Sequence, residues 1–336
     1  MAIRVAVLLA FGSTSDSAPL PRLDCIVKLG GSALTLKAQF ETLNEAVLAR
    51  TAAHIADLAR APHAPPALLI VHGAGSFGHQ HAREYGVGHG SAAHPHAALG
   101  AARTRSAVTR LNTIVVRALV DAGVPAVGIS PFPSWRTRGG ELSADALDCV
   151  QRALAAGLVP VLHGDVVLDE RQGWAILSGD ELMVQAGRLR PQRAVFLMDV
   201  PGVFDRPPSE PDAMLLERID VAADGRAHLP RTSAASHDVT GGVEAKLGAA
   251  LRLARAGVPT YLVRAGSLAE VQVLSGGVPA EGTLVQCASA TGPPSGAPGG
   301  REAASAAATA APAVAVGALI GNDGETSHDG CSGCVR

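Results

Sequence analysis

Three lysines are the first candidates for chemistry in this chain, because lysine is rare in it. Of its 28 basic residues only Lys28, Lys37 and Lys246 are lysines, and the others are arginines. Lysine carries a compact ammonium charge on a flexible stem, whereas arginine presents a planar fork of donors. One explanation of this bias is random drift in amino-acid usage. The other is that such a chain keeps lysine where a point charge must be aimed at an anion.

Glycine-rich turns accompany these lysines. Glycine lets backbone N–H groups approach an anion closely, and a helix N-terminus that follows a strand favours negative charge. Four segments have this composition, and the last of them opens a predicted helix that contains Lys246: Lys28-Leu-Gly-Gly-Ser32, His72-Gly-Ala-Gly-Ser-Phe-Gly-His79, Ser178-Gly-Asp180 and Asp238-Val-Thr-Gly-Gly242. Four such turns in one chain predict a phosphate-binding site.

The common phosphate-binding motifs do not account for these turns. A P-loop needs glycine directly before its lysine, and that position holds Val27, Leu36 or Ala245 here. The His-Arg-Asp and Asp-Phe-Gly motifs of protein kinases do not occur. Gly73-Ala-Gly-Ser-Phe-Gly78 matches a dinucleotide fingerprint, but residues 88–100 contain no acidic residue to hold the ribose. A nicotinamide enzyme therefore remains only a third alternative.

Histidine and cysteine spacing gives little support for a resident metal. His79 with His81, and His94 with His96, could each supply two ligands, but no third ligand follows at metal-site spacing. The five cysteines are too few and too scattered for a disulfide framework, and the Cys331-Ser-Gly-Cys334 motif has no second pair. We expect no protein-held metal and treat the C-terminal motif as incidental.

Composition excludes other classes of protein. With 47% apolar and 17% charged residues the chain can bury a full core. A net charge of −2 and 3% aromatic residues argue against nucleic acid or an anionic membrane as a partner. No apolar stretch approaches the length of a membrane span. The first residues weakly resemble a targeting peptide, but the enzyme-like features favour a cytoplasmic protein.

The elements that must position the lysines alternate along the chain. We predict a β-hairpin over 166–177, an excursion loop over 206–236, strands over 24–31, 67–71, 124–129, 159–162, 194–198, 260–263 and 282–287, and helices over 41–60, 97–122, 144–156, 179–190, 243–256 and 267–274. This alternation is typical of an α/β fold with a mainly parallel sheet covered on both faces. One domain is expected over 23–288, with a disordered leader over 1–22. The Ala-, Gly-, Pro- and Ser-rich tail over 289–336 is expected to be disordered too.

The motifs together resemble the amino acid kinase family, and within it the plant and algal type of the branch that phosphorylates isopentenyl phosphate. The match spans roughly residues 24–287, in the order of that family. The segments that carry it are Ile26–Lys37, Val71–His79, Gly128–Phe132, Val159–Asp165, Leu177–Asp180, Val195–Pro208 and Asp238–Lys246.

The resemblance implies a three-layer α/β/α sandwich whose N-terminal part binds the phosphate acceptor and whose C-terminal part binds ATP. It further implies direct in-line transfer from ATP to isopentenyl phosphate, giving isopentenyl diphosphate for isoprenoid synthesis. Mg2+ would arrive with the nucleotide, and the protein would be a homodimer. Two alternatives remain: a kinase of the same fold with another acceptor (an amino acid, a nucleoside monophosphate or a phosphonate antibiotic), and a non-catalytic nucleotide-binding module.

The resemblance also implies roles for individual residues. Lys28 would bridge the transferring phosphoryl group, Lys246 would accompany the ATP phosphates, and Lys37 would contact a further phosphate. Asp180 would hold the lysines in place, and His79 would donate to the acceptor phosphate. The remaining ATP-binding residues would be Gly30, Gly31, Ser32, Ala74, Asp199, Gly202, Gly241 and Gly242, and the remaining acceptor-binding residues Gly73, Gly75, Gly78 and Gly179.

Some of these assignments rest on the backbone or remain open. Backbone N–H groups would come from Gly30, Gly31, Gly73, Ala74 and Gly75. The usual Thr-Asp-Val-Asp-Gly segment reads Met198-Asp-Val-Pro-Gly202 here, so only backbone contacts are expected from its first and fourth positions. Ser32 could contact phosphate or only shape a turn, and Asp165 could orient the site or cap a turn. His72 and His163 are expected to be structural.

Overall fold

The computed structural model describes residues 23–60, 67–91, 95–222, 224, 226–227 and 241–288 of the 336-residue chain. The predicted leader and tail, with Cys331 and Cys334, lie outside the described residues. So do His94 and the Asp238-Val-Thr240 segment. None of the described helices is long and apolar enough to cross a bilayer.

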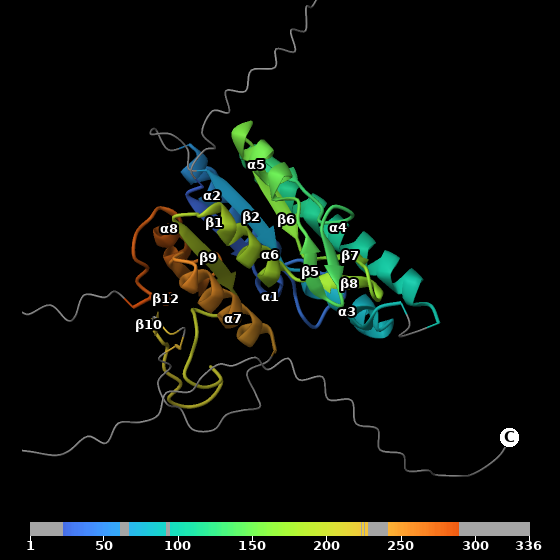
Figure 1. Ribbon diagram of the computed structural model, residues 1–336. Coiled ribbons are helices and arrows are strands. Elements are labelled where there is room, and N and C mark those ends of the chain that lie inside the picture. The colour runs from blue at the N-terminus through green and yellow to red at the C-terminus, as the bar shows by residue number, and fades with distance from the viewer. Residues whose placement is uncertain are drawn as a thin grey trace, which may run out of the picture.

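An eight-stranded sheet forms the centre of the molecule (Figure 1). Its strand order is β10-β12-β11-β9-β1-β2-β6-β3. Within it only β11 and β12 pair antiparallel, so the prediction of a mainly parallel sheet is confirmed. The strands are β1 (Cys25–Leu29), β2 (Leu68–His72), β3 (Ala126–Gly128), β6 (Val159–His163), β9 (Arg193–Met198), β10 (Arg218–Val221), β11 (Thr260–Arg264) and β12 (Thr283–Cys287).

Helices cover both faces of this sheet, which confirms the three-layer sandwich (Figure 1). Each face has its own buried cluster, and the strands supply both because successive side chains point to opposite faces. In β1, Ile26 belongs to one cluster, and Cys25 and Val27 belong to the other. One layer contains α5 (Leu147–Ala155), α6 (Gly179–Ala186) and α7 (Gly241–Arg255); the other contains α1 (Gly31–Leu34), α2 (Glu45–Ala59), α3 (Gly75–Glu84), α4 (Ala97–Asp121) and α8 (Leu268–Leu274).

A second, four-stranded sheet lies beside α3 and α4. Its order is β5-β4-β7-β8, and its strands are β4 (Arg136–Arg138), β5 (Glu141–Ala144), β7 (Asp165–Asp169) and β8 (Gly173–Leu177). The β7–β8 hairpin was predicted, whereas the β4–β5 hairpin was not, because its short polar strands lack an apolar alternation. Asp169 joins the two hairpins by accepting hydrogen bonds from the backbone N–H groups of Gly139, Gly140, Arg171 and Gln172.

Helix α3 is the main element that sequence reasoning missed. Its first residues are rich in glycine, which is a poor helix former, so the segment was interpreted only as a turn. The helix begins at Gly75, whose φ of +50° suits glycine. The N–H of Ser76 donates to Thr35 Oγ1 over 2.9 Å, which ties the start of α3 to the end of α1. The excursion over 206–236 contains one sheet strand, β10, in its described part.

Candidate active site

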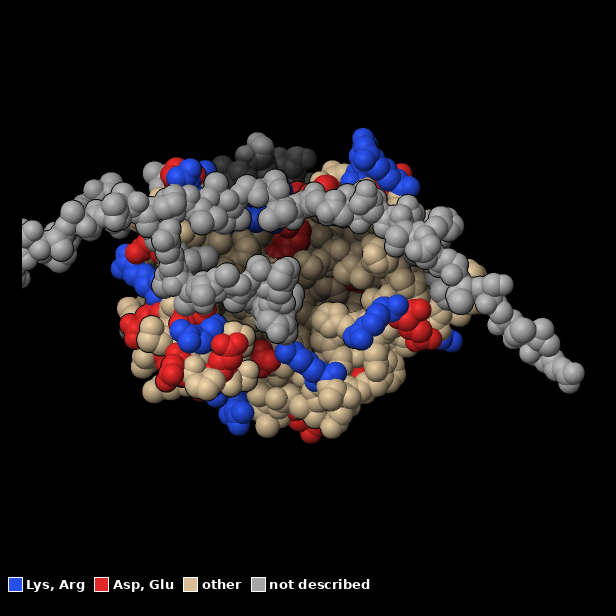
Figure 2. All heavy atoms as spheres, turned by 90° about the horizontal axis from the view of Figure 1, so that it is seen from below, with Lys and Arg blue, Asp and Glu red and all other residues tan. Residues whose placement is uncertain are grey.

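The carboxyl ends of β1, β2, β6 and β9 meet at one edge of the central sheet, where a cavity of about 740 Å³ opens. Open parallel sheets commonly bind ligands at this edge, because loops and helix N-termini converge there. Figure 2 shows the corresponding face hollowed, with acidic and basic side chains around the hollow.

Most residues predicted for the site do meet in this cavity. Its lining includes Lys28, Gly31, Ser32, Lys37, Gly73, Ala74, Gly75, Gly78, His79, Gly179, Asp180, Asp199 and Lys246. Gly30 and Gly202 do not line it. A Cβ on Gly202 would come within 2.6 Å of Thr283 Oγ1, so this glycine is packed against β12. For Gly241 and Gly242 the structure describes only their place at the start of α7.

Lys28 is the most enclosed lysine of the site. It lies in β1 with 4% of its surface exposed, and its Nζ contacts the carboxylate of Asp180 at the start of α6. Burial lowers the pKa of Lys28 to about 8, although Asp180 acts to raise it, and the nearby Lys246 lowers it further. The Lys28 ammonium is therefore still largely protonated near neutral pH and has lost most of its water. An anion in the cavity can replace that lost solvation.

Two glycine turns bring the β1 and β2 ends together. A Cβ on Gly31 would lie 2.5 Å from the backbone nitrogen of Gly75, and one on Gly73 would lie 2.8 Å from that of Gly31. Only residues without a side chain allow this approach. Gly31 and Gly75 are the first residues of α1 and α3. Their N–H groups therefore have no acceptor in a preceding helical turn.

The structure corrects one detail of the predicted backbone donors. The N–H of Gly30 already donates to the carbonyl of Leu197 over 2.9 Å, and that of Gly73 donates to the carbonyl of Leu29 over 3.0 Å. Both N–H groups are therefore already used in hydrogen bonds between the ends of neighbouring strands. The set that can face a phosphate is therefore reduced to Gly31, Ala74 and Gly75.

Asp199 directly follows β9 and lines the part of the cavity formed by the lysines and the glycine turns, which we call the phosphate end. Its carboxylate accepts from Ser32 Oγ over 2.9 Å and pairs with Lys37 Nζ over 3.2 Å. Burial alone would raise the pKa of Asp199, but these two partners lower it overall. The Lys37 side chain is 68% exposed, so its ammonium is far less constrained than that of Lys28. The Ser32 hydroxyl therefore contacts Asp199, and a role for it at a phosphate stays a prediction.

His79 lies on the first turns of α3 and faces the cavity. Burial lowers its pKa, and the charges of Lys246, Arg83, Lys28 and Lys37 lower it further. The ring is thus neutral near pH 7 and can donate one N–H to an anion without adding charge. Sequence reasoning missed Arg83, which also lines the cavity. It lies four residues after His79 and so on the same face of a helix, a relation visible only once α3 is recognised.

The part of the cavity that faces α4 and the small sheet has a mainly apolar lining, and we call it the apolar end. It is lined by Ala82 of α3, Thr104 and Val108 of α4, Val166 of β7, and Ile176 and Leu177 of β8. The long helix α4 supplies only two of these residues, Thr104 and Val108. The small sheet supplies the second wall, because β7 directly follows the central strand β6 and carries its hairpin across the cavity.

His72 and His163 lie behind the cavity and are buried. Their rings stack with centroids 5.5 Å apart. Burial and the nearby His163 lower the pKa of His72 to about 3, and burial also lowers the pKa of His163. His72 Nε2 lies 3.1 Å from the amide nitrogen of Asn112, which fixes α4 to the end of β2. Both histidines are packed in the scaffold, as predicted.

Comparisons with known proteins agree with this geometry. Residues 25–264 match the model of the amino acid kinase family. The isopentenyl phosphate kinase of Arabidopsis thaliana is 37% identical over 75% of this chain and 90% of its own length. The isopentenyl phosphate kinase of Methanothermobacter thermautotrophicus is 38% identical over 71% of this chain and 90% of its own.

The fold comparison leads to the same family. A solved structure of an isopentenyl phosphate kinase superposes with a TM-score of 0.65 at 32% identity, covering 78% of this chain and 99% of that one. With the family model matching most of the folded part and the three lysines gathered in one cavity at the edge of the sheet, the chain belongs to the amino acid kinase family.

Proposed function

We propose that this protein transfers the γ-phosphoryl group of ATP to isopentenyl phosphate and forms isopentenyl diphosphate and ADP. One observation carries the proposal: a single cavity has a cationic end and an apolar end. The cationic end, with Lys28, Lys37, Lys246 and His79, suits two phosphate groups. The apolar end suits a short hydrocarbon chain. The two curated relatives named above are also isopentenyl phosphate kinases.

The chemistry needs positioning and charge neutralisation more than proton transfer. The second pKa of a phosphate monoester is about 6, so the acceptor is largely a dianion near neutral pH and needs no general base. A nonbridging oxygen of the acceptor attacks the γ-phosphorus of ATP. The new P–O bond forms as the bond to the β-phosphate oxygen breaks, and ADP leaves with that electron pair.

In this step the described residues act through charge and orientation. Lys28, fixed by Asp180, faces the transferring group and stabilises its charge. His79 donates an N–H to the acceptor phosphate and so aligns its attacking oxygen. Lys246, on the helix α7 that begins at Gly241, accompanies the nucleotide phosphates. Gly31, Ala74 and Gly75 offer N–H groups between the two substrates.

The proposal keeps Mg2+ with the nucleotide. Each carboxylate of the cavity already has a cationic or hydroxyl partner: Asp180 has Lys28, Asp199 has Lys37 and Ser32, and Asp165 has Arg105 and Ser130. Among the described residues, no three acidic, histidine or cysteine side chains cluster as metal ligands. This donor set fits an ion held by the phosphates of ATP, with which Mg2+ prefers to bind. There it would neutralise phosphate charge.

The two substrates are proposed to bind at different parts of the sheet edge. The acceptor binds toward α3, α4 and the small sheet, and ATP binds toward β9 and α7. We also propose a homodimer, which sedimentation velocity would test by giving twice the monomer mass.

A direct assay tests the function. Purified protein is incubated with ATP, magnesium and isopentenyl phosphate, and the diphosphate is measured beside a panel containing a nucleoside monophosphate, an amino acid and a phosphonate. Turnover is expected only, or at least by far the fastest, with isopentenyl phosphate. Efficient turnover of another acceptor without it would contradict the proposal, and ATP binding without any transfer would favour a non-catalytic module.

A further inference from the structure

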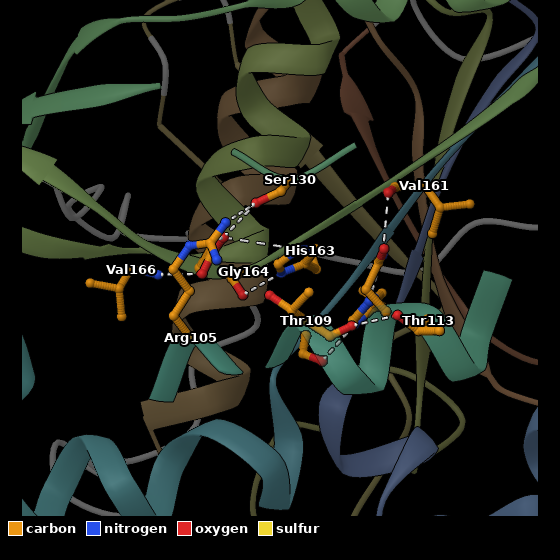
Figure 3. Close-up of polar contacts among 12 residues, drawn as sticks. Arg105, Thr109, Thr113, Ser130, Val161, His163, Gly164 and Val166 are labelled. Atoms are coloured by element: carbon orange, nitrogen blue, oxygen red, sulfur yellow. Dashed lines mark hydrogen bonds and ion pairs between the residues drawn. The ribbon is translucent and has the colours of Figure 1, made fainter. Parts of the chain in front are cut away.

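A charged cluster beside the cavity is not explained by phosphate binding. Arg105 of α4 donates from Nη2 to Ser130 Oγ over 3.0 Å, and Ser130 Oγ donates to Asp165 Oδ2 over 2.9 Å. Arg105 Nε lies 3.7 Å from the same carboxylate oxygen. In Figure 3 the guanidinium of Arg105 points toward Ser130, with Val166 and His163 on opposite sides. We call Arg105, Ser130 and Asp165 the α4 anchor.

The anchor is built around a carboxylate that burial should disfavour. The side chain of Asp165 is 0% exposed, and burial raises its pKa, although the nearby His163, Ser130, Arg105 and the N–H of Val166 lower it. Asp165 lines a cavity meant for anions, where an unpaired carboxylate would repel the substrate. The hydrogen bond from Ser130 and the ion pair with Arg105 offset the negative charge of Asp165. A buried charge kept at such a place, with geometry from three elements, indicates a positional role.

The anchor connects the two walls of the apolar end. Arg105 lies between the cavity-lining residues Thr104 and Val108 on α4, and Asp165 directly precedes the lining residue Val166 on β7. The guanidinium also stacks over the ring of Phe132 at 4.5 Å, which further limits its movement. The length of these contacts therefore sets how far α4 stands from the small sheet.

A second polar contact holds α4 on the other side of Val108. The amide nitrogen of Asn112 lies 3.1 Å from His72 Nε2 and donates to the carbonyl of Val161 over 3.3 Å. That contact fixes the helix to β2 and β6 of the central sheet. The α4 anchor fixes it to the small sheet. Only the latter contact spans the apolar end.

We propose that Arg105, Ser130 and Asp165 are positioning residues for acceptor selection: by tying α4 to β7 they set the width of the apolar end and so restrict the chain that it accepts to a short one. The inference rests on the proposed function for the identity of the acceptor. It does not require any of the three side chains to touch the substrate. Loosening the anchor lets α4 move outward and admits longer chains.

The test compares Arg105→Leu and Ser130→Ala with the matched control Arg117→Leu. Arg117 lies on the same helix in an exposed pair with Asp121, 3.5 Å apart, and far from the cavity lining. Each protein is assayed with five-carbon and ten-carbon prenyl phosphates. Because pocket contacts worth a few methylene groups separate substrates by ten- to several-hundredfold, the ratio of kcat/KM for the longer to the shorter acceptor should rise about tenfold in Arg105→Leu. It should rise about threefold in Ser130→Ala, since the ion pair remains.

Three controls keep these outcomes decisive. The KM for ATP should stay within about twofold of wild type, because the anchor lies at the acceptor end. Arg105→Lys, which retains the charge, should restore part of the selectivity. If Arg105→Leu fails to fold, Ser130→Ala decides the question, because it leaves no charge unpaired. An acceptor ratio that stays within about twofold of wild type or falls, or equal losses on every acceptor, overturns the proposal.

A readout without turnover separates this inference from the proposed function. Hydrogen exchange of residues 97–112 should be faster in Arg105→Leu and Ser130→Ala than in wild type and Arg117→Leu, because the anchor holds that half of α4. Unchanged exchange overturns the anchor whatever the substrate is. A wild-type protein that ignores isopentenyl phosphate but shows the exchange effect would contradict only the proposed function.

Discussion

The two ends of the cavity are built in different ways. The phosphate end is made of short glycine turns and of charged residues near the ends of regular elements, such as Lys28 in β1 and Asp180 in α6. The apolar end is made of single side chains from α3, α4, β7 and β8 that share no motif. Its shape depends on how those elements pack, and the α4 anchor controls one of the distances between them.

This difference predicts how each end responds to mutation. A phosphate contact is strong, local and specific for one kind of charge, so its loss should be large and should affect a particular rate or binding constant. An apolar wall distributes its contribution over many weak contacts. Changes there should be smaller and should alter which acceptor is preferred. The following experiments examine that contrast from the largest expected effect to the smallest.

Replacing Lys28 by arginine should cause the largest loss. The site encloses the Lys28 stem so closely that a Cβ on Gly179 would lie 3.2 Å from Lys28 Cε. A planar guanidinium does not fit there, and the transferring group would lose its aligned ammonium, so kcat should fall by about 100-fold or more. Lys37→Arg is the matched control, because Lys37 is exposed and should lose less than about tenfold. A near-normal kcat for Lys28→Arg would show that its charge alone is enough.

Replacing His79 by glutamine should act mainly on one substrate. Glutamine keeps a donor but changes its reach, so the KM for the acceptor should rise about tenfold or more while the KM for ATP changes less than about twofold. Steady-state kinetics with each substrate varied in turn measures this split. Equal changes in both constants would place His79 between the substrates and not at the acceptor phosphate.

Filling the apolar end should weaken the short acceptor moderately. Ile176 of β8 is 42% exposed and lines the cavity. In Ile176→Phe the larger side chain can be accommodated without disrupting the fold, and it shortens the space available to the acceptor chain. We expect kcat/KM for isopentenyl phosphate to fall about tenfold, the size typical of one or two poorly accommodated methylene groups. The KM for ATP and the melting temperature serve as controls. An unchanged kcat/KM would mean that the acceptor chain lies elsewhere.

The alkaline pH dependence should be the smallest effect. Because the folded protein lowers the pKa of Lys28 to about 8, the ammonium is lost as pH rises through that value, and kcat/KM should be halved there. Asp180 acts to raise this pKa, so in Asp180→Asn the decline should begin at lower pH. A profile of kcat/KM against pH, recorded for both proteins, measures the two midpoints. An identical midpoint would mean that another group titrates.

Sequence reasoning predicted the central sheet and most of the phosphate end, because local chemistry specifies both. Continuous apolar strands, buried along their whole length in β1, β2 and β6, fix the layers, and glycine turns after strands indicate where anions can approach. Reasoning failed at α3, since its glycines are poor helix formers and only packing against α1 and α4 makes them helical. It also took Gly30 and Gly73 as free donors, whereas strand pairing uses their N–H groups.

The sequence by itself determined that this protein handles phosphate: three lysines and four glycine turns fall in an order typical of one kinase family. The tertiary structure alone decided which donors remain available, that Arg83 joins the site, and how the apolar end is closed. The reason is physical. A turn and its charge are specified within a few residues, whereas the width of a cavity is a distance between helices and sheets. In this chain, contacts between residues far apart in sequence, such as Arg105 and Asp165, hold that distance.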